Sequence, residues 1–532
     1  MSARLSVAMI VRDEAKMVPG FLEAARGLWD ELVVVDTGST DDTAALFEAA
    51  GATIVRCPWS RDFAAARNVS LAHATGDWVL VLDADERVSP DFIAQCRGAI
   101  SSPAVGALLV RMSHQLPYGH RRDAWVLRAW KRDPAIHYRH AIREDASDDV
   151  NAMLATRGLC LARVEAPVMH LGYVRDRGAA NDKKARDAAL LRERLGAVPG
   201  DFYCWLKLLE LARAWQDEVL WRETARTATD LIELQGRGVI AGEAWGGELV
   251  AMIAEGLFAP ESAAGLAFLE GWAERWGASP LFLIRRGFFR EHQRLWDGAR
   301  ADYLGALAIR SESGTGAATD QSGWGVAAQL GLARLALAQH DAPVALAHAR
   351  AALASTPRDP EALMAVASLT RYLEGPRALE AWIGSHEAIE PNCPERDWAI
   401  GEALLAVKDH KGAVAAFRRA AGVPPGGPAG LRLAQSLLAS GQVEASERLA
   451  RALLPSQPEA GLGVLLFDLA AGRDTSLELE LTPETAHASL KQWVDVLVAC
   501  RQPALLRRVR SRVAAVGTIF PWLPDYLLEK SA

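Results

Sequence analysis

The sequence lacks the features that mark secreted, membrane-spanning and nucleic-acid-binding proteins. Its six cysteines are scattered over 532 residues without a CxxC pair, which argues against a disulfide framework or a clustered zinc site. No stretch approaches the ~20 apolar residues that a membrane helix needs, and the first apolar run is too short for a signal peptide. Acidic residues outnumber basic ones, 66 to 59, so the basic excess typical of nucleic-acid binders is missing. We therefore expect a cytoplasmic protein with no transmembrane segment and no nucleic-acid partner.

The first third of the chain has the pattern of an α/β domain. A chain of this length exceeds a single hydrophobic core, so two or more domains are expected. Up to about residue 175, short runs rich in Val, Ile and Leu alternate with helical patterns. The runs that predict strands are 5–11, 31–35, 53–55, 78–82 and 107–111. This alternation predicts a mostly parallel sheet covered by helices on both faces, with ligands bound beyond the carboxyl ends of its strands.

The remainder of the chain has a helical pattern with a repeat. Pro357, Pro391 and Pro425 are separated by 34 residues each, and Pro458 follows 33 residues later. Small and bulky residues recur in one order: Ala345, Ala349 and Ala352; Ala413, Phe417 and Ala420; Ala299, Tyr303 and Ala306. A 34-residue period of paired helices resembles tetratricopeptide repeats, which bury their apolar faces by stacking. An irregular helical bundle is the alternative.

Acidic residues follow the fourth predicted strand. The run 78–82 ends in Asp83, Ala84 and Asp85. Because alternate residues of a strand share a face, Asp83 and Asp85 are expected to project the same way. Two such carboxylates suit a divalent cation that bridges the phosphates of a nucleotide. For an isolated DxD, a solvated turn at the start of a helix is the alternative.

Other polar residues are expected at the same edge of the sheet. Asp36 ends the second predicted strand and could accept a hydrogen bond from a uracil N–H or a ribose hydroxyl. Arg12 and Glu14 follow the first strand. Arg67 lies on a predicted helix, where it could pair with a phosphate or with an acidic neighbour.

The motifs together resemble a known family. In order, MIVRDE, VVVDTGSTDDT, WSRDFAAARNVSL, ATGDWVLVLDADE and MHLGY resemble inverting glycosyltransferases of family 2. The resemblance is to the branch that includes bacterial peptide and lipopolysaccharide-core glycosyltransferases and often carries tetratricopeptide repeats, and it covers about residues 4–215. It implies a Rossmann-like glycosyltransferase A-type mixed sheet, a nucleotide-diphosphate-sugar donor, with UDP as the expected nucleotide, and a catalytic Mn²⁺ or Mg²⁺. The domains expected are a catalytic domain at 1–178, a helical linker with degenerate repeats at 179–320, and an all-α tetratricopeptide-like solenoid at 321–532.

The resemblance also implies roles for individual residues. Asp85 would ligate the metal, and Asp83 would contact the ribose, the metal or a metal-bound water. His170, in VMHLGY, is a candidate third metal ligand, with a structural histidine as the alternative. The residues expected to line the nucleotide pocket are Val11, Arg12, Glu14, Asp36, Gly38, Arg67, Asp83 and Ala84.

Inverting transfer also needs a base that takes the acceptor's proton. Related enzymes place a Glu or Asp in the segment that corresponds to AIREDA (141–146), so Glu144 is the predicted base and Asp145 the second choice. Arg143 stands where a histidine is usual in that family. An exposed ion pair of Arg143 and Glu144 is the alternative. His140 is close enough in sequence to orient Glu144.

The sequence thus predicts a metal-dependent inverting glycosyltransferase. It would transfer a hexose or N-acetylhexosamine to a protein, peptide or saccharide acceptor, and the repeats would recruit the acceptor or a partner protein. Self-association is left open. The alternative is a tetratricopeptide-type scaffold with a degenerate nucleotide-sugar-binding domain, against which the intact DADE and AIRED segments argue. A nucleotidyltransferase fits poorly, because MIVRDEAK lacks the glycines of a phosphate loop.

Overall fold

The structure is a computed structural model that forms two compact units. It describes residues 3–115, 121–142, 144–171, 177–215, 217–241, 243, 245–277, 279–312, 321–422, 425, 427–473, 481, 483–500, 502–516 and 520–529. The first unit runs to Asp341, and the second begins at Ala342. The first unit therefore includes 321–341, which the sequence analysis assigned to the repeat domain. The finer division into three domains stays a prediction.

The first unit contains an eight-stranded mixed sheet, in the order β3-β2-β1-β4-β7-β6-β8-β5. The strands are β1 Leu5–Val11, β2 Glu31–Asp36, β3 Thr53–Arg56, β4 Trp78–Val81, β5 Glu86–Arg87, β6 Val105–Gln115, β7 Arg121–Lys131 and β8 Cys160–His170. Strands β1 to β4 run parallel, β7 is antiparallel to β4 and β6, and β8 is parallel to β6. All five predicted strands are present, and the expected mixed sheet is confirmed.

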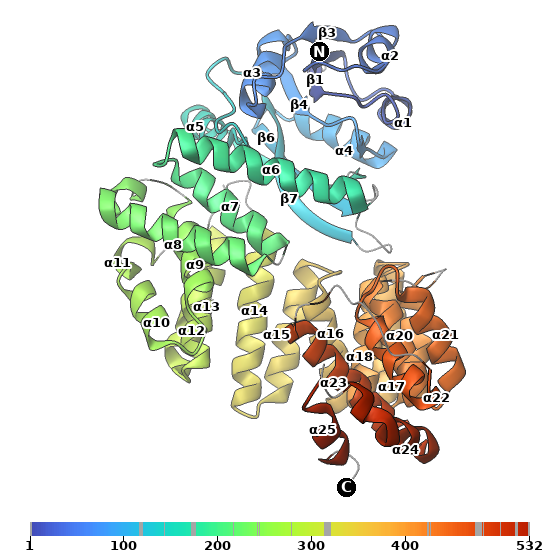
Figure 1. Ribbon diagram of the computed structural model, residues 1–532. Coiled ribbons are helices and arrows are strands. Elements are labelled where there is room, and N and C mark those ends of the chain that lie inside the picture. Colours follow the sequence, from blue (N-terminus) through green and yellow to red (C-terminus); the bar gives the residue numbers. More distant parts are fainter. Residues whose placement is uncertain are drawn as a thin grey trace. The chain divides into compact units, whose positions relative to one another are not determined.

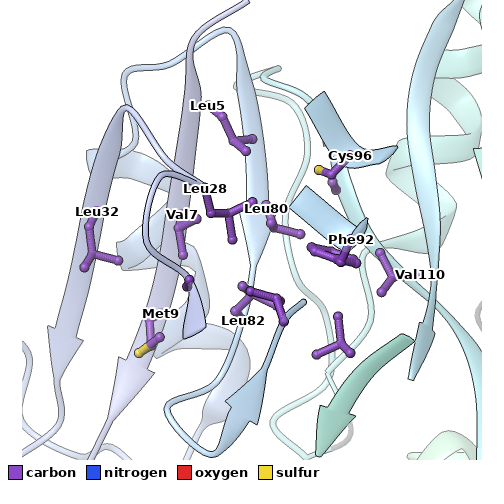
Figure 2. Packing of buried hydrophobic residues seen from close by; sticks show 14 of the residues in the cluster. Leu5, Val7, Met9, Leu28, Leu32, Leu80, Leu82, Phe92, Cys96 and Val110 are labelled. Carbon is purple, nitrogen blue, oxygen red and sulfur yellow. The ribbon is translucent and has the colours of Figure 1, made fainter. Parts of the chain in front are cut away.

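Helices cover both faces of this sheet. They are α1 Val18–Ala24, α2 Thr43–Ala49, α3 Phe63–His73, α4 Pro90–Ile100 and α5 Ser147–Arg157. Alternation along β1 sends Val7 to the core beneath α1 and α4, and Ala8 to the core that α5 covers. Leu80, Phe92 and Val110 lie next to one another in the first of these cores (Figure 2). Each such fully buried side chain stabilises the fold by roughly 1.5–3 kcal/mol.

Paired helices complete the first unit (Figure 1). They are α6 Arg177–Ala197, α7 Phe202–Ala214, α8 Glu218–Gln235, the 3₁₀ helix η2 Arg237–Ile240, α9 Gly246–Leu257, α10 Ala263–Glu270, α11 Ala273–Trp276, α12 Pro280–His292, α13 Trp296–Glu312 and α14 Gln321–Ala338. Ile142, from the segment of the predicted base, packs into a core with Leu191 of α6 and Leu208 of α7. The loop that carries Glu144 is thus held by the helices that follow the sheet.

The second unit is helical in all its described elements. These are α15 Ala342–Ser355, α16 Pro360–Leu373, α17 Pro376–Ile389, α18 Pro394–Ala406, α19 His410–Ala420, α20 Gly427–Ala439, α21 Val443–Leu453, α22 Ala460–Ala471, α23 Pro483–Ala499, α24 Pro503–Arg512, the 3₁₀ helix η3 Val513–Val516 and α25 Leu523–Glu529. The 34-residue period corresponds to a helix pair, because Pro357 and Pro391 precede α16 and α18. One of the predicted bulky positions, Phe417 of α19, packs closely on α18, since a side chain on Gly401 would lie 2.6 Å from its ring. The expected helical repeat solenoid is confirmed.

Within the described ranges, every helix is either too short or too polar to cross a bilayer.

Candidate active site

The carboxyl ends of β1 and β2 carry a tightly bonded pair of loops. Val11 pairs with Asp36 in the sheet register. Asp36 is buried, and its Oδ1 accepts hydrogen bonds from the backbone amides of Gly38 at 3.2 Å and Ser39 at 2.9 Å. Gly38 has a φ of +110°, a conformation that favours glycine. Asp36 and Gly38 thus shape the turn at the sheet edge where the nucleotide pocket was predicted.

The other predicted pocket residues of β1 and its loop have mixed surroundings. Val11 is a core side chain, and its carbonyl accepts from the amide and hydroxyl of Thr37. Arg12 is exposed, and the amide of Glu14 donates to the Thr43 hydroxyl at 2.8 Å. Asp13, with a φ of +53°, accepts from the Thr40 amide at 2.7 Å. These bonds tie the loop after β1 to the loop after β2.

The DADE segment is a turn rather than a strand end. Strand β4 ends at Val81, and Asp83 exchanges hydrogen bonds with Glu86: the Asp83 amide donates to Glu86 Oε2 at 3.0 Å, and the Glu86 amide donates to the Asp83 carbonyl at 3.0 Å. The expectation that Asp83 and Asp85 share one strand face is therefore wrong. Ala84 is buried in this turn, and Ser89 caps the following helix α4.

Arg67 of α3 connects two acidic segments. Its Nη2 donates to Asp83 Oδ1 at 2.7 Å, and its Nε donates to Glu144 Oε1 at 3.2 Å. Its side chain is 7% exposed. Burial opposes the charge, but Asp83 and Glu144 outweigh that effect and raise the pKa of Arg67. Arg67 was predicted to pair with a phosphate or with an acidic neighbour. It has two acidic neighbours, Asp83 and Glu144, which lie 16 and 77 residues away in the sequence.

Two further residues of this network were not among the predicted site residues. Arg128 of β7 donates through Nη2 to Glu86 Oε1 at 2.7 Å and lies 3.8 Å from Asp83 Oδ2. Burial raises the pKa of Glu86 to about 7. Burial also raises the pKa of Asp83, but Arg67 and Arg128 together lower it to about 2. Asp83 is therefore held as an anion between two arginines.

Asp85 points to a different partner. Its Oδ2 lies 3.5 Å from His170 Nε2, and its carbonyl accepts from the Leu171 amide at 3.0 Å. His170 Nδ1 lies 3.0 Å from Nδ1 of His114, its register partner on β6. No group of three or more His, Cys, Asp or Glu side chains suited to a metal occurs among the described residues. Of the three residues predicted to contact a metal, Asp85 and His170 lie together, whereas Asp83 faces Arg67 and Arg128.

The carboxylates of Glu144 and Asp145 have different hydrogen-bond partners. Asp145 pairs with Arg139 through the backbone, and its Oδ1 accepts from the amide and the hydroxyl of Ser147 at the start of α5. Glu144 instead contacts Arg67 and lines the cavity described below. Arg143 lies outside the described residues, so the predicted ion pair of Arg143 with Glu144 stays a prediction.

A cavity of about 710 Å³ lies against this network. The sheet domain contributes Arg67, Asp83, Arg128, Glu144 and other residues to one wall. Residues of the following helices form the opposite wall; among them are Tyr203, Lys207, Trp245, Glu248, Trp276 and Trp324. Charged groups that could act on a donor and an acceptor therefore face a partly open cavity of ligand size.

Sequence comparisons point to one family. The family described as "Glycosyl transferase family 2" matches residues 6–164. The chain is 35% identical over 212 residues to a TPR repeat-containing protein, Synpcc7942_0270, of Synechococcus elongatus, covering 39% of this chain and 51% of that protein. It is 33% identical over 91 residues to glycosyltransferase RC0292 of Rickettsia conorii, described as uncharacterized, covering 17% of this chain and 32% of that one. The chain thus spans about half of the first relative and a third of the second.

Solved structures give weaker similarities. Glucosyl-3-phosphoglycerate synthase from Mycobacterium tuberculosis, solved with Mn²⁺, UDP and glucosyl-3-phosphoglycerate, is 18% identical, with a TM-score of 0.25 over 36% of this chain and 79% of that one. PilW, a type IV pilus biogenesis factor, is 14% identical, with a TM-score of 0.30 over 41% of this chain and 90% of that one.

Proposed function

Because residues 6–164 are a domain of glycosyl transferase family 2, we propose that the chain is an inverting glycosyltransferase that uses a nucleotide-diphosphate sugar. The observation that carries the proposal is the position of Arg67. This buried guanidinium contacts both Asp83, in the predicted donor segment, and Glu144, the predicted base. Donor and acceptor chemistry would therefore take place on either side of one side chain.

The donor's diphosphate would lie near the two buried arginines. Arg67 Nη1 and Arg128 Nε are buried donors without a hydrogen-bond partner among the described residues. Buried donors are normally satisfied, so each could donate a hydrogen bond to a phosphate oxygen. Asp36 and Gly38 after β2 would hold the nucleoside, together with Val11, Arg12 and Glu14 at the end of β1 and Ala84 in the turn after β4. UDP remains the expected nucleotide.

Asp85 and His170 would hold the divalent ion, Mn²⁺ or Mg²⁺. A carboxylate and an imidazole 3.5 Å apart fit such an ion when substrate phosphates complete its shell. When bound, the ion would neutralise charge on the departing nucleoside diphosphate. Asp83 lies between Arg67 and Arg128. It would therefore contact the ribose and position Arg67 rather than ligate the metal.

Glu144 would act as the base. The acceptor's hydroxyl oxygen attacks the anomeric carbon as the bond to the diphosphate breaks, and the hydroxyl proton passes to the Glu144 carboxylate. The anomeric configuration inverts. Asp145 is the second candidate, but the start of α5 already uses one of its oxygens.

The acceptor would be a protein, a peptide or a saccharide, and the second unit would recruit the acceptor or a partner protein. Solenoids of paired helices offer extended surfaces suited to that task. A cytoplasmic location is consistent with six free cysteines. The scaffold alternative stays distinguishable, because it predicts no turnover of any donor.

The test is nucleoside diphosphate release from a panel of UDP- and GDP-hexoses and N-acetylhexosamines, with and without Mn²⁺. We expect Mn²⁺-dependent release from at least one donor. Release from none of them, by a folded full-length chain, would support the scaffold instead.

A further inference from the structure

The helices after the sheet approach the predicted base closely. His140, which has a φ of +67°, stacks on Tyr203 of α7 with ring centroids 3.6 Å apart. Lys207 Nζ lies 4.9 Å from the centroid of the same tyrosine ring. The loop that carries Glu144 is therefore fixed on α7, and helices outside the family 2 match form part of the site.

These helices also supply most of the aromatic surface opposite Glu144. Trp245 lies 5.8 Å from Tyr203, between ring centroids, and Trp276 and Trp324 line the same cavity. The Trp276 indole nitrogen is buried without a hydrogen-bond partner among the described residues. Glu248 and Lys207 line the same cavity. This wall thus combines aromatic rings with hydrogen-bonding groups.

The charges on the cavity nearly cancel. Of the lining residues, Arg67, Arg128, Lys207 and Arg275 are basic, and Asp83, Glu144, Asp145, Asp148 and Glu248 are acidic. Lys207 is in addition paired with Glu210 at 2.8 Å. Once the donor's diphosphate has taken Arg67 and Arg128, the far wall has no cationic excess for a second anion. A phosphorylated acceptor would therefore be poorly accommodated.

The far wall is also poorly suited to an extended peptide. Its residues come from helices, whose interior N–H and C=O groups bond within the helix, so no strand edge is available for a peptide backbone. A sugar ring, in contrast, offers apolar C–H faces and a rim of hydroxyls to such a wall. A volume of about 710 Å³ is that of a small-ligand site.

Building on the proposed function, we propose that the wall formed by α7, α9, the α11–α12 segment and α14 is an acceptor subsite for a neutral saccharide. Trp245 and Trp324 would contribute the rings against which sugar rings pack, and Lys207 and Glu248 would bind hydroxyls. Tyr203, whose ring stacks with His140, supports this wall. The acceptor hydroxyl then lies beside Glu144. The glycosyltransferase domain is thus incomplete without the helices up to α14.

Binding can be tested without turnover. The full-length chain is titrated with cellobiose and chitobiose while tryptophan fluorescence is recorded, and with glucose 6-phosphate and a serine-containing decapeptide for comparison. We expect saturable quenching by at least one disaccharide at about millimolar concentration and none by the other two probes. Failure of the proposed function alone would leave this binding intact, since no donor is needed.

Two variants and one control complete the test. Trp324→Ala and Glu248→Gln are each expected to weaken disaccharide binding about tenfold. Trp382→Ala, which removes a partly buried tryptophan of α17 in the second unit, should leave it unchanged. Because glutamine has nearly the same volume as glutamate, Glu248→Gln is expected to fold. It therefore tests binding even if Trp324→Ala unfolds. Quenching by the peptide or phosphosugar instead, no saturable quenching by either disaccharide, or equal affinity in Glu248→Gln and the wild type would overturn the proposal.

Discussion

Two buried arginines, one in each unit, differ in what surrounds them. Arg67 and Arg358 are both 6% exposed. Arg358 pairs with Glu395 at 2.8 Å and with Glu390 at 3.5 Å, and thereby joins the turn after α15 to the start of α18. Arg67 also pairs with two carboxylates, but all three groups line a cavity. A buried ion network is therefore not evidence of a site by itself; the adjoining cavity makes the difference.

The largest effect is expected at the proposed metal site of the first unit. Asp85→Ala should lower sugar transfer about a thousandfold, or ~4 kcal/mol, because a metal ligand is lost. Asp91→Ala, at the exposed first turn of α4, is the matched control and should keep full activity. Steady-state transfer at saturating Mn²⁺ measures both. Normal turnover by Asp85→Ala would remove Asp85 from the metal site.

The next prediction tests the comparison itself. Arg67→Lys should lower kcat/KM about a hundredfold, because lysine cannot bind both carboxylates and a phosphate with the fixed geometry of a guanidinium. Arg358→Lys should lower the free energy of unfolding by about 3 kcal/mol through its damaged buried pair and leave kcat unchanged. Denaturant unfolding and transfer assays on both variants give the two readouts. If both variants lost activity equally at full folding, the distinction between the two arginines would fail.

The smallest expected effect is on the pH dependence of stability, through Glu248 on the far wall of the cavity. Burial, then Glu210, raises the pKa of Glu248 to about 7 from its ordinary 4.5. Between these values the folded state keeps a proton that the unfolded state releases, so this contribution to stability is present below pH 4.5 and is lost as pH rises through about 7. Glu248→Gln should flatten the fall in melting temperature over that window. An unchanged slope would mean that Glu248 titrates normally.

Local sequence patterns predicted the elements but not the contacts between them. The alternation in β1 and the apolar run before Asp83 predicted strands, because each depends only on neighbouring residues. The DADE turn was predicted only as the alternative to a strand end, since it depends on the Glu86 side chain bonding to the Asp83 amide. Arg128 carries no local signal either: it becomes part of the site only because β7 lies next to β4 in the sheet.

The candidate base shows the same limit. The sequence left Glu144 and Asp145 as neighbours of equal chemistry, and Ser147 distinguishes them by engaging Asp145. The stack of His140 on Tyr203 joins residues from different regions of the chain, and no periodicity reports such a pair. The family resemblance supplied the expected roles of these residues, and the structure supplied their distances.

The central claim is that Arg67 holds a donor site and a base together in one transferase. The most direct measurement is single-turnover sugar transfer by Glu144→Gln, with nucleoside diphosphate affinity measured in parallel by calorimetry and Glu165→Gln, on the exposed face of β8, as the control. The account predicts that Glu144→Gln binds the nucleotide within about twofold of the wild type, but transfers sugar about a thousandfold more slowly. Transfer by Glu144→Gln at the rate of Glu165→Gln would contradict it.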